Sequence, residues 1–230
     1  MALKLSILIP AYNEASTLET LVERVRKVDL PLEREIILVD DGSTDGTADI
    51  ARSLADSQTR VLFHERNRGK GAALRTALAQ ASGDFVLVQD ADLEYDPKDY
   101  ARLLEPLLDG RADAVYGSRF LGGPHRVLLF WHYLGNAFFT LLTNLLYNVN
   151  LTDMGVCYKA FRTEALRAIP LESDRFGFEP EVTAKACKRR LRLYEVPISY
   201  SGRTYAEGKK ITWKDGLTYL WCLLRYRLAD

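Results

Sequence analysis

The stretch DFVLVQDADLEYDP, residues 84–97, decides the fold we expect. Residues 85–88 form a short apolar run of β-forming residues, which is typical of a strand buried on both faces of a sheet. Asp90, Asp92 and Glu94 follow directly after this run. Open α/β sheets bind their ligands beyond the carboxyl ends of the strands. We therefore expect these carboxylates to lie at the ligand-binding edge of an α/β sheet.

The spacing of Asp90 and Asp92 predicts a divalent metal site. Side chains two residues apart on an extended segment point the same way, so two bare carboxylates repel each other there. A hard cation such as Mg²⁺ relieves this repulsion and usually completes its shell with substrate phosphates. The alternative is that Asp96 and Pro97 begin a helix and the other acids are ordinary turn residues.

The first half of the chain alternates strand and helix patterns. Strands are expected at 5–10, 35–39, 61–63, 85–88 and 114–116, with helices near 18–25, 45–56 and 70–81 and a helix starting at Pro97. This alternation favours βαβ units and a mainly parallel sheet, and right-handed crossovers place the strand ends on one rim. Charged residues follow the expected strand ends, so we expect those side chains to converge.

Composition excludes several classes of protein. The 230 residues suit one α/β domain, and Lys+Arg and Asp+Glu balance at 31 each, so no nucleic-acid partner is expected. The three cysteines show no Cys-x-x-Cys spacing, which argues against a zinc site or a disulfide framework. The N-terminus leads directly into a strand, so we expect no signal peptide.

Two common nucleotide-binding motifs are absent. PAYNE (residues 10–14) is not the Gly-rich turn of dinucleotide-binding enzymes, and RGKG (68–71) lacks residues that a Walker loop needs. The backbone around Gly69 and Gly71, together with Lys70, either approaches a phosphate or only forms a turn.

The second half departs from the strand–helix alternation. Residues 127–151 contain no Asp, Glu, Lys or Arg, and a polar stripe recurs at helical spacing: His132, Asn136, Thr140, Thr143 and Tyr147. We expect an interfacial amphipathic segment at 127–149, with two helices meeting near Gly135 as one arrangement of it. A buried core helix is the alternative. A second amphipathic helix is expected at 213–227.

Three further segments carry candidate functional residues. Residues 152–162 return to strand-like composition with Asp153 at their start, and Glu179 and Glu181 stand in the first turn of a helix that reaches about residue 190. Residues 193–200 are expected to form an edge strand because they contain Pro197. A basic, Gly-containing loop, RTYAEGKK, follows at 203–210.

The set PAYNE (10–14), VDDGSTDG (39–46), GKG (69–71), DADL (90–93) and GSR (117–119) resembles the successive motifs of family 2 glycosyltransferases with the GT-A fold. The match covers about the first 120 residues. The loop at 203–210 and the charge-free segment resemble the polyprenyl-phosphate branch, the dolichol-phosphate mannose and glucose synthases. The stretch DMGV (153–156) departs from that pattern, because it lacks the Ser or Thr expected near the acceptor.

The resemblance implies an inverting, metal-dependent hexosyltransferase. It implies a UDP- or GDP-hexose donor and a dolichyl or undecaprenyl phosphate acceptor, with the protein peripheral on the cytoplasmic face of the membrane. Residues 1–120 would form the nucleotide-sugar-binding half and residues 121–230 the acceptor-binding half.

The resemblance also assigns roles to individual residues. The base and ribose would be held by Pro10, Tyr12, Glu14 and Asp41, with Asp40 nearby. Mg²⁺ or Mn²⁺ would be bound by Asp90 and Asp92, which flank Ala91, with Glu94 behind them. The diphosphate would be contacted by Lys70, Arg203 and Lys209, and the acceptor phosphate by Arg119. We expect Asp92, Arg119, Asp153 and Glu179 to be the catalytic group.

The nature of the acceptor decides whether a base is needed. A lipid phosphate is already anionic at neutral pH and needs none, whereas a saccharide hydroxyl needs one, for which Asp153 and Glu179 are the candidates. Two alternatives thus stand beside the lipid-phosphate transferase. One is a family 2 enzyme acting on a saccharide or other hydroxyl, and the other is a non-catalytic nucleotide-sugar-binding module, against which the intact acids argue.

Overall fold

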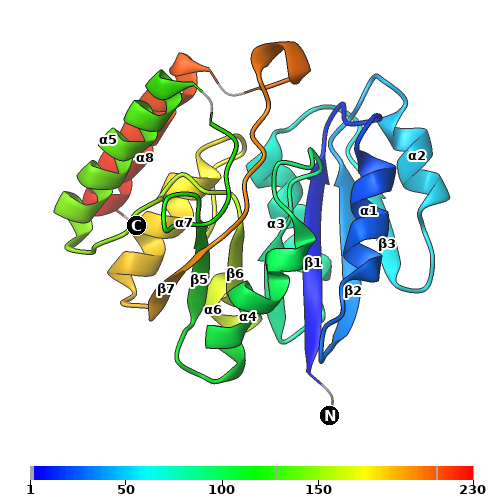
Figure 1. Cartoon of the computed structure of the whole chain (residues 1–230), viewed down its shortest axis with the longest axis horizontal. Coiled ribbons are helices and arrows are strands. Elements are labelled where there is room, and N and C mark those ends of the chain that lie inside the picture. The colour runs from blue at the N-terminus through cyan, green and yellow to red at the C-terminus, as the bar shows by residue number, and fades with distance from the viewer. Residues whose placement is uncertain (1–2, 128, 211, 230) are drawn as a thin grey trace.

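The computed structural model describes every residue except 1–2, 128, 211 and 230. A seven-stranded sheet with strand order β3-β2-β1-β4-β6-β5-β7 runs through it (Figure 1). The strands are β1 (Lys4–Ala11), β2 (Glu33–Asp40), β3 (Thr59–Phe63), β4 (Phe85–Val88), β5 (Ala114–Ser118), β6 (Lys159–Arg162) and β7 (Leu193–Pro197). The longer helices are α1 (Leu18–Lys27), α2 (Thr47–Ser53), α3 (Lys70–Gln80), α4 (Tyr100–Leu108), α5 (Phe130–Tyr147), α7 (Phe178–Lys188) and α8 (Trp213–Leu228), and the short ones are η1 (Pro97–Asp99), α6 (Thr163–Arg167) and η2 (Tyr205–Glu207).

The five strands expected in the first half are confirmed, and so is the mainly parallel sheet. Every strand pair is parallel except those that involve β6, which runs antiparallel between β4 and β5. The four residues of β4 are all buried, as expected for a central strand. Because β6 runs in the opposite direction, its start lies at the rim where the parallel strands end. The edge position expected for Pro197 is confirmed, since β7 is the last strand of the sheet.

The strand-like reading of residues 152–162 was wrong over its first part. Only Lys159–Arg162 form a strand, and the residues before it form a loop. The reason is that side chains satisfy the loop's backbone in place of a sheet neighbour. The Nζ atom of Lys159 donates to the carbonyls of Met154 and Val156, and the carboxylate of Glu195 accepts the N–H of Thr152 at 2.8 Å.

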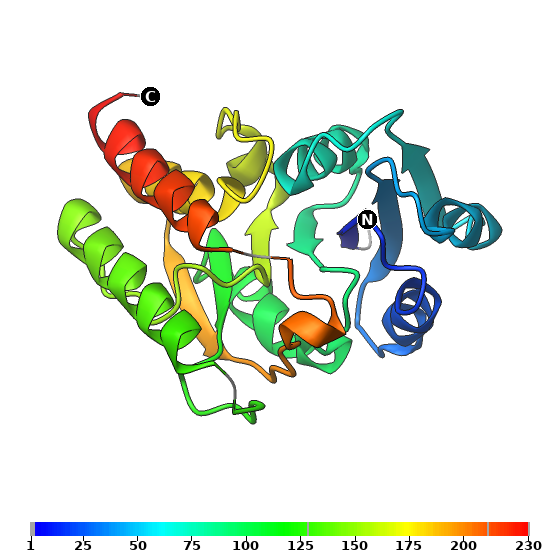
Figure 2. The same ribbon diagram turned by 90° about the horizontal axis from the view of Figure 1, so that it is seen from above.

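Helices cover both faces of the sheet (Figure 2). Helix α1 buries Leu18, Leu21, Val22 and Val25 against the sheet, following the predicted apolar spacing. The helix expected at Pro97 begins as a single 3₁₀ turn, with Asp96 as its N-cap accepting the N–H of Lys98 at 3.0 Å, and continues as α4. The alternative reading of Asp96 and Pro97 is thus confirmed for these two residues.

Helices α5 and α8 lie side by side at one end of the sheet (Figures 1 and 2). The rings of Phe139 and Tyr219 meet edge to face, with centroids 5.5 Å apart, and the hydroxyl of Tyr147 donates to the carbonyl of Leu223 at 2.7 Å. The expected break near Gly135 was wrong, because α5 is continuous from Phe130 to Tyr147. No helix among the described residues is both long and apolar enough to cross a membrane.

Candidate active site

A cleft of about 390 Å³ opens at the carboxyl ends of the parallel strands, and most of the predicted site residues line it. Those residues are Pro10, Tyr12, Glu14, Asp41, Lys70, Asp90, Ala91, Asp92, Glu94, Arg119, Arg203 and Lys209. Three predicted residues, Asp40, Asp153 and Glu179, do not line the cleft. Each of these three is buried beneath the surface.

Asp90 and Asp92 are brought together at the end of β4, as the sequence predicted. Leu93 adopts a left-handed backbone with φ of 63°, which is uncommon for a non-glycine residue. This turn lets the N–H of Glu94 donate to Oδ1 of Asp92 at 3.1 Å. Burial raises the pKa of Asp92 to about 7, and the neighbouring charges of Asp90 and Glu94 add to this effect. Crowded carboxylates of this kind favour a bound cation.

Asp90 and Asp92 each face a basic side chain from another part of the chain. Oδ1 of Asp90 lies 2.6 Å from the Nζ atom of Lys70, and Oδ2 of Asp92 accepts from Nη2 of Arg203 at 3.1 Å. The described residues contain no group of three or more His, Cys, Asp or Glu arranged to hold a metal ion. A metal here would therefore take Asp90 and Asp92 from the protein and further oxygens from a substrate's phosphates.

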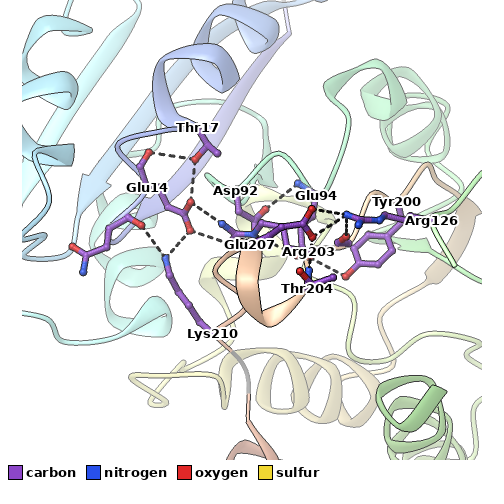
Figure 3. A network of polar contacts seen from close by, with 12 residues as sticks. Glu14, Thr17, Asp92, Glu94, Arg126, Tyr200, Arg203, Thr204, Glu207 and Lys210 are labelled. Carbon is purple, nitrogen blue, oxygen red and sulfur yellow. Dashed lines mark hydrogen bonds and ion pairs between the residues drawn. The ribbon is translucent and has the colours of Figure 1, made fainter. Parts of the chain in front are cut away.

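Glu94 lines the cleft beside Asp92, and its place behind the metal stays a prediction. Its carboxylate accepts the hydroxyl of Tyr200 at 2.9 Å and the backbone N–H of Arg203 at 2.8 Å (Figure 3). Its own carbonyl accepts the N–H of Ser201 at 2.9 Å. Glu94 thus fixes the start of the basic loop over the end of β4.

Glu14 lines the cleft, and its contact with base and ribose stays a prediction. It binds the guanidinium of Arg203 through both carboxylate oxygens, at 3.0 Å each, and the Nζ atom of Lys210 lies 2.6 Å from Oε1 (Figure 3). A two-pronged arginine–carboxylate contact fixes the orientation of both groups. The basic loop is thereby held against the first and fourth strands, although it lies far away in sequence.

Asp41 lines the cleft but uses its carboxylate to shape the loop before α3. Oδ1 accepts the N–H of Arg68 at 2.9 Å and lies 2.6 Å from Nδ1 of His64, while Oδ2 accepts the N–H of Gly69 at 2.7 Å. No motif in the sequence indicated a role for His64. Asp40 lies behind the cleft, where Oδ2 accepts the N–H of Ser43 at 3.2 Å.

The two glycines around Lys70 are required by a close backbone approach. A Cβ atom on Gly71 would lie 2.1 Å from the carbonyl oxygen of Ser173, and one on Gly69 would lie 2.4 Å from that of Asp174. The N–H of Ala72 donates to the same Asp174 carbonyl at 3.0 Å. Lys70 at the start of α3 is thus held between Asp90 and the segment around Ser173.

Glu179 supports Lys70 from below the cleft. Its side chain is fully buried, and Oε1 lies 3.1 Å from the Nζ atom of Lys70. Neither carboxylate oxygen accepts a hydrogen bond of good geometry within the described residues. Lys70 therefore bridges two carboxylates, Asp90 at the cleft surface and Glu179 beneath it, and the charge of Glu179 is balanced by Lys70.

Asp153 forms a similar buried pair with Arg119. The carboxylate is fully buried and accepts Nε and Nη2 of Arg119, both at 2.7 Å, together with the backbone N–H of Arg119 at 3.1 Å. The amide of Asn136 on α5 donates to the same carboxylate at 3.0 Å. Arg119 itself lines the cleft, with its guanidinium 5.1 Å from the ring centre of Tyr200. Asp153 thus orients Arg119.

Several lining residues carried no signal in the sequence. They are Asn67, Arg175, Phe176, Tyr200 and Tyr219, which join the cleft from separate elements. Tyr219 comes from α8, so the C-terminal helix contributes directly to the cleft. A periodicity argument places Tyr219 on a helix, but it does not show that this part of the helix faces the strand ends.

Comparison with known proteins shows the family of this chain. Residues 6–169 match the family described as glycosyl transferase family 2. The chain belongs to this family. It is 33% identical over 217 residues to an undecaprenyl-phosphate mannosyltransferase of Micrococcus luteus, covering 88% of this chain and 85% of the relative. It is 29% identical over 213 residues to a dodecaprenyl-phosphate galacturonate synthase of Rhizobium johnstonii, covering 90% of this chain and 62% of the relative.

A solved structure of another protein shows the same fold. Glucosyl-3-phosphoglycerate synthase of Mycobacterium tuberculosis, crystallised with Mn²⁺ and UDP-glucose, superposes with a TM-score of 0.76 at 23% identity, covering all 100% of this chain and 80% of that one. The expected GT-A fold is thereby confirmed.

Proposed function

We propose that this family 2 glycosyltransferase moves a hexosyl group from a UDP- or GDP-sugar to a polyprenyl phosphate, with Mg²⁺ or Mn²⁺ bound at the donor. The names of the Micrococcus and Rhizobium relatives, which both refer to a prenyl phosphate, support this acceptor class. The Mn²⁺ and UDP-glucose in the Mycobacterium enzyme support a metal-assisted nucleotide-sugar donor.

Asp90 and Asp92 fit the metal, since both line the cleft and their crowding favours a cation. When bound, the metal supplies positive charge to the donor's diphosphate as it becomes the leaving group. Lys70, Arg203 and Lys209 line the same cleft and add fixed positive charge. Preorganised charge of this kind is usually the largest contribution to catalysis.

The observation that carries the choice of acceptor is the burial of both base candidates. Asp153 and Glu179 are fully buried, lie outside the cleft lining, and are paired with Arg119 and Lys70. A hydroxyl acceptor needs a base within hydrogen-bonding reach of its proton. A phosphate monoester already carries a charge of about −1.5 to −2 at pH 7 and needs none.

The reaction is then a single displacement. A phosphate oxygen of the acceptor attacks the anomeric carbon and forms the new C–O bond, while the bond to the nucleoside diphosphate breaks and its electron pair leaves with the diphosphate. Arg119 orients the attacking phosphate, because a guanidinium suits phosphate oxygens. Attack from the face opposite the leaving group inverts the anomeric configuration.

The outer faces of α5 and α8 support a peripheral position on a membrane. Trp131 and Leu145 of α5 are 76% and 73% exposed, and Trp221 of α8 is 64% exposed. Helices with exposed apolar and aromatic residues lie in the membrane interface. We propose that this face rests on the bilayer that contains the acceptor, on the side where nucleotide sugars are present, which is the cytoplasmic side.

The direct test is an acceptor assay with the full chain. Radiolabelled UDP- and GDP-hexoses are offered with Mn²⁺ to undecaprenyl phosphate, to free saccharides, or to no acceptor, with EDTA as the metal control. We expect label in the organic phase only with the lipid phosphate and metal. Label transferred to a saccharide instead would favour the hydroxyl alternative. Donor binding without transfer to any acceptor would favour a non-catalytic binding module.

A further inference from the structure

Helix α5 has two faces with opposite characters. Its outer face exposes Trp131, Phe138 and Leu145. Its inner face carries polar residues at four-residue spacing, which places them on one side of the helix: Asn136, Thr140 and Asn144. All three bind one loop, residues 151–154, which contains Asp153.

These contacts attach the helix to the loop at three successive turns. The side chain of Asn144 accepts the N–H of Leu151 at 2.9 Å and donates to its carbonyl at 2.8 Å. The hydroxyl of Thr140 accepts the N–H of Met154 at 3.2 Å. Asn136, one turn earlier, reaches the carboxylate of Asp153.

On its other side the same loop is held by the last strand. The carboxylate of Glu195 in β7 accepts the backbone N–H of Thr152 at 2.8 Å and that of Asp153 at 3.1 Å. The backbone of Asp153 is therefore fixed between α5 and the sheet, and only its side-chain conformation can still vary. That side chain is oriented by Arg119 and by Asn136.

Asn136 bridges the two members of the buried ion pair. Its Nδ2 donates to Oδ1 of Asp153 at 3.0 Å, and its Oδ1 accepts from Nη2 of Arg119 at 3.4 Å. The opposite amide orientation would set oxygen against the carboxylate and nitrogen against the guanidinium. Only a side chain with a donor and an acceptor side by side satisfies both partners, so shape alone does not explain an asparagine here.

We propose that Asn136 is a positioning residue, which holds the Arg119–Asp153 pair so that the guanidinium of Arg119, which lines the cleft, faces the acceptor phosphate. The helix face that binds the lipid surface is thereby joined to the group that binds the lipid's phosphate. This inference rests on the proposed function in one respect, that the acceptor bound by Arg119 is a phosphate.

The first test replaces Asn136 by Leu and by Asp. Asn136→Leu removes both hydrogen bonds, and Asn136→Asp keeps the shape but sets a second carboxylate against Asp153. Because hydrogen bonds to charged groups are the strong ones, we expect KM for the polyprenyl phosphate to rise about tenfold or more in both variants. KM for the nucleotide sugar should change less than about twofold. Lys70 pairs with Asp90 and Glu179, and Arg203 pairs with Glu14 and Asp92, rather than with Arg119 or Asp153.

Gly155 offers a second route to the same contact. A Cβ atom at this position would lie 2.5 Å from Oδ1 of Asn136, with Tyr219 the next neighbour at an ordinary 3.7 Å. Gly155→Ala should therefore displace the amide and raise the acceptor KM as Asn136→Leu does. In Asn136→Ala the space is empty, so the added methyl group fits. We expect the double variant Asn136→Ala/Gly155→Ala to match Asn136→Ala alone, a non-additive result.

Thr143→Val is the matched control on the same helix. Within the described part of the chain, the hydroxyl of Thr143 donates to the carbonyl of Phe139 in its own helix, at 2.8 Å, and Val keeps its volume. Both KM values and kcat should stay at wild-type levels. An unchanged acceptor KM in Asn136→Asp, or equal losses for donor and acceptor, would overturn the positioning role. If the wild-type protein transferred no hexosyl group to polyprenyl phosphate, the proposed function would be overturned, and this inference with it.

Discussion

At the residue scale, Asp92 is the residue on which the metal-assisted reaction depends most. Asp92→Asn keeps the shape and leaves Arg203 bound to Glu14 through both carboxylate oxygens, so the fold should persist. It removes one of the two carboxylates that fit a metal. Binding stabilises the native state by mass action, so we expect the Mn²⁺-dependent rise in melting temperature with UDP- or GDP-sugars to disappear. We expect the transfer rate to fall at least about a hundredfold, as for the loss of one group that stabilises the transition state.

The matched control for this prediction lies four residues further on. Asp96→Asn makes the same chemical change at the N-cap of η1, where asparagine is as good a cap as aspartate. Its thermal shift and its rate should equal those of the wild type. A full metal-dependent shift in Asp92→Asn would contradict the assignment of Asp92 to the metal.

The position of a single residue could be predicted where it follows a strand end. It could not be predicted where it depends on a partner that is distant in sequence. Asp90 and Asp92 follow an apolar strand, so their place at the rim follows from local pattern. The pairing of Asp153 with Arg119, and of Glu179 with Lys70, depends on contacts between separate elements. No local pattern distinguishes a carboxylate that acts as a base from one that orients a cation. The predicted catalytic role of both acids therefore stays untested, and their burial favours the second reading.

At the scale of elements, the start of α3 is the tightest junction near the cleft. Gly71→Ala would set a methyl group 2.1 Å from the carbonyl oxygen of Ser173, so the two backbones must separate. Such strain typically costs about 1–3 kcal/mol of unfolding free energy. We expect a lower denaturation midpoint in urea together with weaker donor binding, because Lys70 moves with the helix start.

Gly135→Ala is the comparison that isolates the steric cause. Gly135 lies inside α5, and nothing lies within 4 Å of a Cβ atom built there. Alanine is the better helix former by about 0.8–1.0 kcal/mol, so this variant should be slightly more stable than the wild type. If Gly71→Ala were equally stabilised, the close approach to Ser173 would not be real.

Glu35 of β2 forms hydrogen bonds with residues of β1 and with Ser82, and these contacts should make the stability of the protein depend on pH. Burial by itself raises the pKa of Glu35, but hydrogen bonds from Ser6, Ser82 and Lys4 outweigh it and lower the pKa from 4.5 to about 2. A lowered folded-state pKa stabilises the protein above the unfolded value, and the effect is lost as pH falls from 4.5 toward 2. Because the carboxylate is partly exposed and screened by solvent, we expect the shift to contribute about 2 kcal/mol at neutral pH, less than its full conversion.

Glu35→Gln tests this linkage, with Glu33→Gln on the same strand as an exposed control. Unfolding free energies from urea titrations at pH 7 should show Glu35→Gln less stable by about 2 kcal/mol, whereas Glu33→Gln should differ by less than about 0.5 kcal/mol. The deficit of Glu35→Gln should shrink as the pH approaches 3. A deficit that stays constant with pH would show that the carboxylate charge is not its cause.

Helices and strands were predicted correctly where their residue pattern is regular. The prediction failed where the backbone N–H groups bond to side chains from other elements. Strands β1 to β5 are apolar runs bounded by turns, and this local pattern identified them. The loop before β6 has strand-like composition, yet its N–H groups bond to the side chains of Glu195, Thr140 and Asn144. Those partners lie on other elements, so composition alone gave the wrong answer. The polar stripe of α5 was visible, but what it binds was not.

At the scale of the whole molecule, the same pair of helices, α5 and α8, contacts the active site on one side and exposes apolar side chains on the other. Helix α8 contributes Tyr219 to the cleft and exposes Trp221 two residues later. Helix α5 binds the Arg119–Asp153 pair on one side and exposes Trp131 on the other. A lipid acceptor has its phosphate at a membrane surface, so an enzyme that uses it needs its phosphate-binding group close to a membrane-facing surface. The arrangement of these two helices meets that need.

The same arrangement predicts how the protein distributes between vesicles and solution. A protein with Trp131→Ser and Leu145→Ser loses two large side chains that are 76% and 73% exposed and contact little of the rest of the fold, so stability should be unaffected. We expect the wild type to sediment with vesicles that contain anionic lipid and the double variant to stay largely in the supernatant, because burial of a large apolar side chain contributes about 1.5–3 kcal/mol. With a short, water-soluble prenyl phosphate both proteins should turn over at the same rate, since neither substitution touches the cleft. Equal sedimentation of the two proteins would show that this face does not rest on the membrane, and a variant that is slow on the soluble acceptor would show that the face acts within the active site itself.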